Sequence, residues 1–257
     1  MKQKGTPVKG KKRKIRREFI WLTVGLILMA VLLAAYLSAT RPRPDLTEEK
    51  VPAETGEAEV TETAPSWWVN NCEIDEAGGI PVTHNHVPWD SSRRPGEIRE
   101  IHYLTIHETD NRSSGADSEA HNSLLTNDTS DITGWHYTVD DHSIYHNLPD
   151  NEIGWNAGDN RTELGGNMNG IGIEMCVNLS NDFEATLRNT AELAAKLLVT
   201  YDLKVEDVRL HADFMDKVCP HRLISEGRVE EFYQMIRDAY IRLKAEHIRE
   251  SIVRSFG

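Results

Sequence analysis

The apolar positions in the second half of the chain fall into short runs that fit strands. Residues 101–107 (IHYLTIH) and 171–178 (IGIEMCVN) are runs of this kind, and residues 208–210 (VRL) form a shorter one. Residues 136–140 and 143–146 are separated by two positions only, which predicts a hairpin that turns at Asp141 and His142.

Other segments show helical spacing. Residues 116–126 predict a short helix, and residues 183–201 carry apolar side chains every three to four positions, with Asn181 or Asp182 as the N-cap. A last helix is predicted from about Ser225 onward, with one apolar face.

Strands interleaved with helices predict an α/β fold, a single domain with a central mixed β-sheet flanked by helices. The chain has 257 residues, enough for one sizeable core with length to spare for appendages. We place this domain at residues 67–257. A segment rich in Gly and Asn, residues 152–169, is long for a loop, and such loops are usually functional or disordered.

The N-terminal part of the chain has a different pattern. Residues 19–39 (FIWLTVGLILMAVLLAAYLSA) contain no charge, and as a helix they match the ~30 Å hydrocarbon core of a bilayer. A cleaved signal peptide is the alternative, but its apolar region is usually only ~7–15 residues long. We therefore expect one uncleaved transmembrane helix, a signal anchor.

Charge sets the expected orientation of this helix. Residues 1–18 form a basic tail in which nine Lys and Arg lie within the first 17 positions, with no acid among those 17. The positive-inside rule then places the N-terminus in the cytoplasm and the domain outside the cell membrane. The segment between them, residues 40–66, is dominated by Pro, Glu and Thr and is predicted to be a disordered linker.

The rest of the chain is acidic. The 41 Asp and Glu all lie beyond position 17, and the formal net charge of the chain is −12. A phosphate-binding surface needs clustered positive charge, so we expect no nucleic-acid partner for the domain.

Three residues suit a metal site by type and position. His107 ends an apolar run, His211 follows another, and Cys219 comes eight residues later. A catalytic zinc takes three protein ligands such as imidazole and thiolate and keeps one position open. The same residue types also occur as an ordinary polar histidine and a small buried cysteine, so spacing alone leaves both interpretations open.

Glu174 is the candidate acid or base. It alternates with Ile171, Ile173 and Met175 along its predicted strand, and therefore lies on the opposite face from them. Its own face carries Gly172 and Cys176, small residues that leave space around a carboxylate. This pattern favours a pocket, although an exposed strand residue would also fit it.

Five blocks of sequence, in this order, resemble the zinc-dependent N-acetylmuramoyl-L-alanine amidases and the related peptidoglycan recognition proteins. The blocks span roughly residues 101–223 and are LTIHET at 104–109, GWHYTVDD at 134–141, GWNAGD at 154–159, NGIGIEMC at 169–176 and LHADFMDKVCPH at 210–221.

The resemblance implies a zinc enzyme that cuts the amide bond between N-acetylmuramic acid and L-alanine in peptidoglycan. It implies Zn²⁺ as the cofactor and peptidoglycan as the substrate. The implied zinc ligands are His107, His211 and Cys219, with Glu174 and Lys217 as catalytic residues. The implied substrate-binding residues are Trp135, His136, Trp155 and Asn156. Where several relatives carry His, this chain has Asn156.

Two further alternatives stay open from the sequence. The domain could be a module that binds peptidoglycan without cutting it, although all the expected ligands are present. Cys72 and Cys176 could form a disulfide, which a sequence cannot establish.

Overall fold

The computed structural model describes residues 74–128 and 130–256. Its strands are β1 (Glu76–Ala77), β2 (Ile80–His84), β3 (Tyr103–Glu108), β4 (Tyr137–Val139), β5 (Ile144–His146), β6 (Gly170–Met175) and β7 (Val208–Leu210). Its α-helices are α2 (Ser118–Asn127), α3 (Gly166–Asn169), α4 (Phe183–Thr200), α5 (His221–Ser225) and α6 (Val229–Phe256). Two 3-10 turns, η2 (Val205–Asp207) and η3 (His211–Asp213), flank β7.

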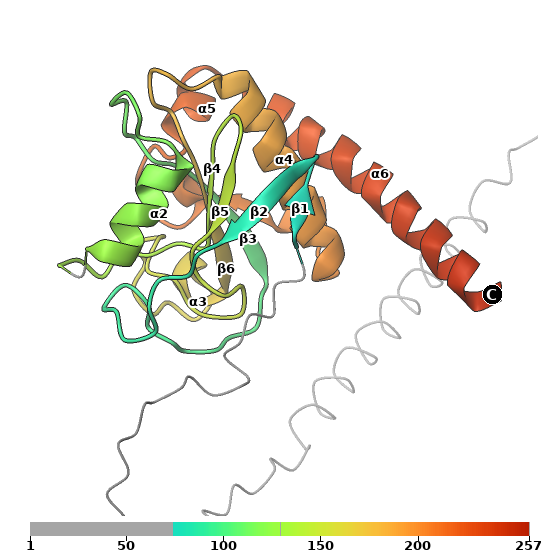
Figure 1. The fold of residues 1–257 in the computed structure, drawn as a ribbon, viewed down its shortest axis with the longest axis horizontal. Coiled ribbons are helices and arrows are strands. Elements are labelled where there is room, and N and C mark those ends of the chain that lie inside the picture. The colour runs from blue at the N-terminus through green and yellow to red at the C-terminus, as the bar shows by residue number, and fades with distance from the viewer. Residues whose placement is uncertain (1–73, 129, 257) are drawn as a thin grey trace, which may run out of the picture. The chain divides into compact units, whose positions relative to one another are not determined.

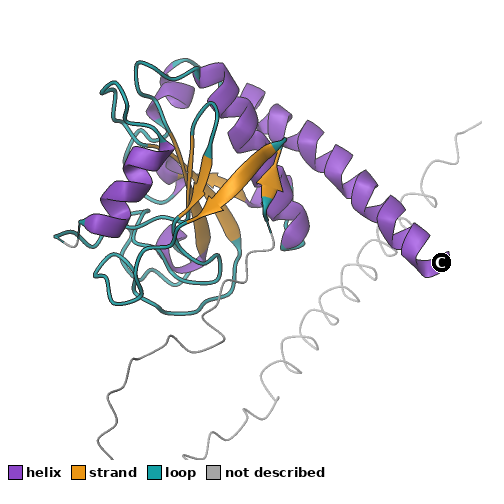
Figure 2. Cartoon of the chain, in the orientation of Figure 1, coloured by secondary structure: helices purple, strands orange, loops and turns teal. Residues whose placement is uncertain are grey.

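The seven strands form one mixed sheet in the order β1-β2-β5-β4-β6-β3-β7. The strands β4, β6, β3 and β7 run parallel to one another, so their carboxyl ends meet at one edge of the sheet. β5 runs antiparallel to β4, and β2 runs parallel to β5. The predicted α/β fold with a central mixed sheet is therefore confirmed for the described residues (Figure 2).

The two faces of the sheet carry different residues, because side chains alternate along each strand. One face contributes the main hydrophobic core, with Leu104 and Ile106 from β3, Ile171 and Ile173 from β6, and Leu210 from β7. The opposite face carries Thr105 and His107 on β3, Gly172 and Glu174 on β6, and Thr138 on β4. The side chains of His107 and Glu174 are thereby separated from this core by the sheet itself.

Helices cover both faces, as Figure 1 shows: α4 and α6 lie on one side of the sheet and α2 on the other. The helix α4 buries a stripe against the core face that includes Leu187, Ala191, Ala194 and Leu198. On the other side, Leu125 of α2 packs with Val87, Trp135 and Leu148 in a second, smaller apolar cluster.

The predicted hairpin and the long helix are confirmed. β4 and β5 pair with Val139 opposite Ile144, and the turn between them contains Asp141 and His142. The helix α4 begins at Phe183, and the carboxylate of its N-cap Asp182 accepts hydrogen bonds from the backbone of Glu184 and Ala185.

The start predicted for the last helix, near Ser225, is wrong. The short helix α5 ends at Ser225, and α6 begins only at Val229. Gly227 lies between them with a φ of 68°, a left-handed conformation that glycine adopts without strain and that ends a helix. The residues between the two helices, Glu226, Gly227 and Arg228, carry no apolar side chain, and the apolar face of the last helix begins only at Val229.

The segment 152–169 is held by its own polar side chains. The carboxylate of Asp159 accepts the backbone N–H groups of Gly166 and Asn167 at the start of α3. Asn167 Oδ1 in turn accepts the backbone N–H groups of Asn156 and Ala157, at 2.8 and 2.7 Å. This loop therefore has a defined shape, and it passes next to β6.

The predictions for residues 1–66 lie outside the described residues, as does Cys72. Among the residues that the structure describes, no helix is both long enough and apolar enough to cross a bilayer. Cys176 is a buried free thiol, 3.9 Å from His121 Nδ1.

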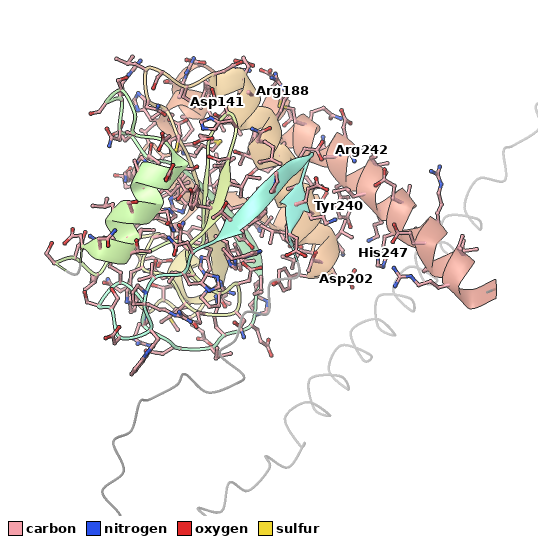
Figure 3. All side chains as sticks on the ribbon, in the orientation of Figure 1. Asp141, Arg188, Asp202, Tyr240, Arg242 and His247 are labelled. Carbon is pink, nitrogen blue, oxygen red and sulfur yellow. The ribbon has the colours of Figure 1, made fainter. Side chains whose placement is uncertain are left out.

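Polar contacts fasten α6 to the rest of the domain. Arg242, labelled on α6 in Figure 3, forms an ion pair with Glu192 of α4. Nearer the start of α6, the hydroxyl of Tyr233 donates to the backbone carbonyl of Val208 in β7, at 3.1 Å. These contacts supplement the apolar packing of Phe232 and Ile236, which are almost fully buried.

Packing of α6 gives a first prediction. Phe232→Ala removes a side chain that is 1% exposed, and we expect it to lower the free energy of unfolding by about 3–5 kcal/mol. Ile241→Ala, on the same helix but 61% exposed, should change it by less than about 0.5 kcal/mol. Urea unfolding measures both. Equal effects of the two substitutions would contradict the packing described here.

Candidate metal centre and active site

Three predicted ligands meet at the carboxyl edge of the parallel strands. His107 is the next-to-last residue of β3, and His211 follows directly after β7, the neighbouring strand. Cys219 lies at the end of the loop that leaves His211. The possible ligand atoms of these three residues all lie within 4.8 Å of one another, and all three side chains are buried. The sheet thus brings together two histidines that are 104 residues apart in the sequence.

Asn156 sets the orientation of the His107 ring. Asn156 Nδ2 donates to the carbonyl of Gly154 at 2.9 Å, which leaves Oδ1 as the acceptor that faces His107 Nε2 at 3.1 Å. His107 therefore carries its ring proton on Nε2, and Nδ1 keeps its lone pair. A hydrogen bond of this kind is the usual way in which proteins select the tautomer of a metal-binding histidine.

Gly172 makes this contact possible. A Cβ atom at Gly172 would lie 2.8 Å from Cγ of Asn156, too close for any side chain. The loop 152–169 can therefore cross β6 closely enough for Asn156 to reach His107 only because position 172 has no side chain.

His211 supplies the second imidazole nitrogen that could bind a metal, beside Nδ1 of His107. Its Nδ1 lies 3.0 Å from Nδ1 of His107, and its ring also hydrogen-bonds the backbone of Ala157. Burial is the largest cause that lowers the pKa of each histidine, and that of His107 falls well below its ordinary value. Both rings are therefore neutral at pH 7, and a neutral imidazole is the form that binds a metal.

The loop that carries Cys219 is closed by two groups of hydrogen bonds. The backbone N–H of Ala212 donates to the carbonyl of Cys219 at 3.0 Å, which ties the end of the loop to its beginning. The carboxylate of Glu108, the last residue of β3, accepts the backbone N–H groups of Arg222 and Leu223 in α5. Glu108 thus fixes the segment that follows Cys219 to the strand that carries His107.

The donor set fits a zinc ion. Zinc–nitrogen bonds are about 2.0–2.1 Å long, so two nitrogens at adjacent corners of a tetrahedron lie ~3.3 Å apart. The observed separation of 3.0 Å between the two Nδ1 atoms is close to this value. Burial raises the pKa of the Cys219 thiol to about 12, and a divalent cation is the partner that would favour the thiolate there. Two imidazoles and a thiolate also leave one position of a tetrahedral ion open.

Glu174 stands beside this centre on β6. It is in register with His107 on β3 and with Thr138 on β4. Its Oε2 atom is buried and has no hydrogen-bond partner among the described residues. Burial raises the pKa of Glu174 to about 8, while the charge of Lys217 acts in the opposite direction. A carboxylate with a raised pKa and a free oxygen can accept and return a proton near neutral pH.

Lys217 is exposed and lines a surface pocket formed by residues 212–218 and Ile224. Burial has the largest influence on the pKa values of the two ligand histidines and of Glu174. The positive charge of Lys217 acts on all three as well, lowering each pKa. Its positive charge therefore acts on the groups of the centre.

The predicted substrate-binding residues differ in their burial and in the groups that they contact. Trp135 is buried, and its Nε1 donates to Thr138 Oγ1 at 2.7 Å. His136 is fully buried, and its Nδ1 accepts the backbone N–H of Gly172 at 3.0 Å. Trp155 is partly exposed and packs against the guanidinium of Arg161. Asn156 contacts His107 rather than solvent. Their role in substrate binding stays a prediction.

Two positioning residues escaped the sequence analysis. Glu108 accepts backbone N–H groups that are distant in the sequence, and Asn167 accepts backbone N–H groups within its own loop; no side-chain pattern indicates such partners. The Gly and Asn content of residues 152–169 was the only available signal for Asn167.

The fold and the site define an α/β domain with a buried His-His-Cys centre at the carboxyl edge of its sheet. The family model for N-acetylmuramoyl-L-alanine amidase (Amidase_2) matches residues 97–222. The N-acetylmuramoyl-L-alanine amidase XlyA of Bacillus subtilis is 38% identical over 146 residues, which are 56% of this chain and 48% of XlyA. CwlH, from the same organism, is 37% identical over 56% of this chain and 57% of its own length. The chain thus spans about half the length of these curated relatives.

Solved structures give the same result for the domain. A mutant endolysin from Bacillus subtilis superposes with a TM-score of 0.58 and 35% identity, covering 61% of this chain and 99% of that one. The catalytic domain of XlyA gives a TM-score of 0.58 and 34% identity over the same shares. The chain belongs to the N-acetylmuramoyl-L-alanine amidase family.

The contact between Asn156 and His107 gives a second prediction. Asn156→Ala removes the acceptor that holds the ring proton on Nε2, and we expect zinc affinity to fall by about 10–100-fold. Competition with a chromophoric chelator measures the affinity. Asn127→Ala removes an exposed amide on α2 and serves as the control, which should bind zinc as the wild type does. Unchanged zinc affinity in Asn156→Ala would show that Asn156 does not influence metal binding by His107.

The raised pKa of Glu174 gives a third prediction, for protein treated with a chelator. Between the ordinary pKa of 4.5 and the folded value of about 8, the folded protein keeps a proton that the unfolded chain has released. Stability due to this group therefore falls as pH rises through that interval. Glu174→Gln removes this loss, so its stability relative to the wild type should be greater at pH 9 than at pH 5. A difference that is the same at both pH values would contradict the raised pKa.

Proposed function

We propose that this chain is a zinc-dependent N-acetylmuramoyl-L-alanine amidase, which hydrolyses the amide bond between N-acetylmuramic acid and the L-alanine of the peptide stem. The observation that carries the proposal is the convergence of His107, His211 and Cys219, with Glu174 and Lys217 beside them. Membership of the amidase family supports the choice of substrate.

The reaction needs a stronger nucleophile than neutral water and a stabilised oxyanion. Zinc bound by His107, His211 and Cys219 would lower the pKa of water toward ~7 and polarise the carbonyl group. Glu174 removes a proton from the attacking water, whose oxygen adds to the carbonyl carbon. As the carbon–nitrogen bond breaks, Glu174 passes that proton to the departing amino group of L-alanine.

Lys217 has an electrostatic role in this proposal. Its ammonium group, on the exposed loop over the centre, would face the negative charge that develops on the carbonyl oxygen. One well-placed donor of this kind contributes roughly 3–4 kcal/mol to stabilising a transition state. Its exposure is compatible with a long side chain that closes over bound substrate.

We further propose that residues 19–39 anchor the chain in the cell membrane, with the domain outside. The uncharged length of that segment and the nine preceding basic residues support this. The proposal is tested by fractionating cells that express the full chain. Sedimentation with membranes, together with digestion of the domain by external protease in wall-stripped cells, is the expected result. Release of the domain into the medium would argue for a cleaved signal peptide.

The amidase proposal is tested with purified peptidoglycan. Incubation with the protein should produce stem peptides with a free N-terminal alanine and glycan with intact muramic acid, both identified by mass spectrometry. A chelator should abolish the products and added zinc should restore them. Binding of zinc-loaded protein to the wall without new amino termini would favour a recognition module instead.

The assigned roles give a fourth prediction. Glu174→Gln removes the proton acceptor, and we expect kcat to fall by about 10²–10⁴-fold while bound zinc is retained. Lys217→Ala should lower kcat by about 10²–10³-fold, also with zinc retained. Arg188→Ala, on the exposed surface of α4 (Figure 3), is the control and should keep full activity. Full activity in Glu174→Gln would exclude it as the base.

A further inference from the structure

A second group of histidines lies away from the centre described above. It comprises His84 at the end of β2, His86 two residues later, and His146 at the end of β5. His84 Nδ1 lies 3.0 Å from His146 Nδ1, and His86 Nε2 lies 3.1 Å from the same atom. One possible ligand atom from each of the three residues falls within 4.8 Å of the others.

Carboxylates lie on the far side of two of these rings. His146 Nε2 is 3.3 Å from Oδ1 of Asp150, and His84 Nε2 is 3.5 Å from Oδ1 of Asp75. The contact of His146 with Asp150 is a charge contact without hydrogen-bond geometry. The negative charge of a carboxylate beside Nε2 still favours a proton on that nitrogen, which leaves the lone pair on Nδ1. The two Nδ1 lone pairs then face each other at 3.0 Å, an arrangement that is repulsive unless a cation lies between them.

The ring of His146 is held rigidly. It is fully buried and stacks on Tyr137, with ring centroids 4.4 Å apart and an angle of 9° between the planes. The partner carboxylate of Asp150 is also fully buried and accepts hydrogen bonds from the hydroxyls of Tyr137 and Tyr201, at 3.2 and 2.7 Å. This arrangement fixes one imidazole with its free nitrogen directed at the other two.

The two groups of histidines are separate. His146 lies opposite Tyr137 in the register of β4 and β5, and Tyr137 belongs to the core face of the sheet. His107 lies on the other face, on β3, and the strands β4 and β6 stand between β3 and β5. The second group therefore cannot contribute to the first centre.

We propose that His84, His86 and His146 form a second zinc site. Imidazole nitrogens are ligands that suit zinc, and carboxylates behind two of them supply the usual outer partners of metal-binding histidines. The site is independent of the proposed amidase activity. Its ligands come from segments 60 and 62 residues apart, so the ion fastens β2 and the residues that follow it to β5.

Metal analysis of the purified full chain tests this proposal. After zinc loading and removal of free metal, we expect about two zinc ions per chain in the wild type and about one in His86→Gln. His86 lies outside the strands and touches no residue of the first centre, so His86→Gln should keep the activity of the wild type. His102→Gln, which replaces an exposed histidine outside both groups, is the control and should keep about two.

The complementary variant removes the first centre. The double variant His211→Gln, Cys219→Ser should retain about one zinc ion, and adding His86→Gln should abolish it. Cobalt(II) bound by the double variant should show a ligand-field spectrum without the thiolate charge-transfer band of the wild type. A wild type that binds only about one zinc ion, lost entirely in the double variant, would overturn the second site. That outcome would leave the first centre and its activity unaffected, and the wild-type stoichiometry decides the matter even where a variant fails to fold.

Discussion

The close approach of two neutral imidazoles is the constraint on which the site depends. His107 and His211 hold their Nδ1 atoms 3.0 Å apart in a buried position, and Asn156 keeps the proton of His107 on the other nitrogen. With the lone pairs of both Nδ1 atoms facing each other, such a pair is repulsive in the absence of a cation, so the surrounding contacts must impose it. Glu108 secures the Cys219 segment to β3, and Gly172 allows Asn156 to approach. Much of the loop structure on this side of the sheet therefore serves to hold a few nitrogen and sulfur atoms together.

The two faces of the sheet have different roles, one in stability and the other in the proposed chemistry. Its core face packs against α4 and α6 and contains the main apolar cluster. Its other face carries His107 and Glu174 on neighbouring strands in register. A buried carboxylate with a raised pKa opposes folding near neutral pH, and the apolar packing on the opposite face offsets this cost. The active-site side can thus carry unfavourable groups without loss of the fold.

The sequence predicted the elements that depend on local patterns. Alternation located β3 and β6 and placed Glu174 opposite the core, and the hairpin followed from two short runs with a two-residue turn. The pairing of His107 with His211 came from the family resemblance, because spacing could not distinguish ligands from ordinary residues. Glu108 was missed because its partners are backbone groups far away in the sequence, and Asn167 because its partners are backbone groups of its own loop, which no side-chain pattern indicates. The start of α6 was misplaced because a separate short helix, α5, ends at Ser225, and Gly227 separates it from α6.

X-ray absorption at the zinc edge tests the central claim most directly, because it reports which atoms surround the metal. The full chain carrying His86→Gln, which leaves the first centre intact and removes a ligand of the second group, would be loaded with one equivalent of zinc, and the same chain with Cys219→Ser added would be measured beside it. We expect one sulfur at about 2.3 Å together with imidazole nitrogens at about 2.0–2.1 Å, and loss of the sulfur when Cys219 is replaced. A shell of nitrogen and oxygen alone in His86→Gln, unchanged by Cys219→Ser, would contradict the proposed centre.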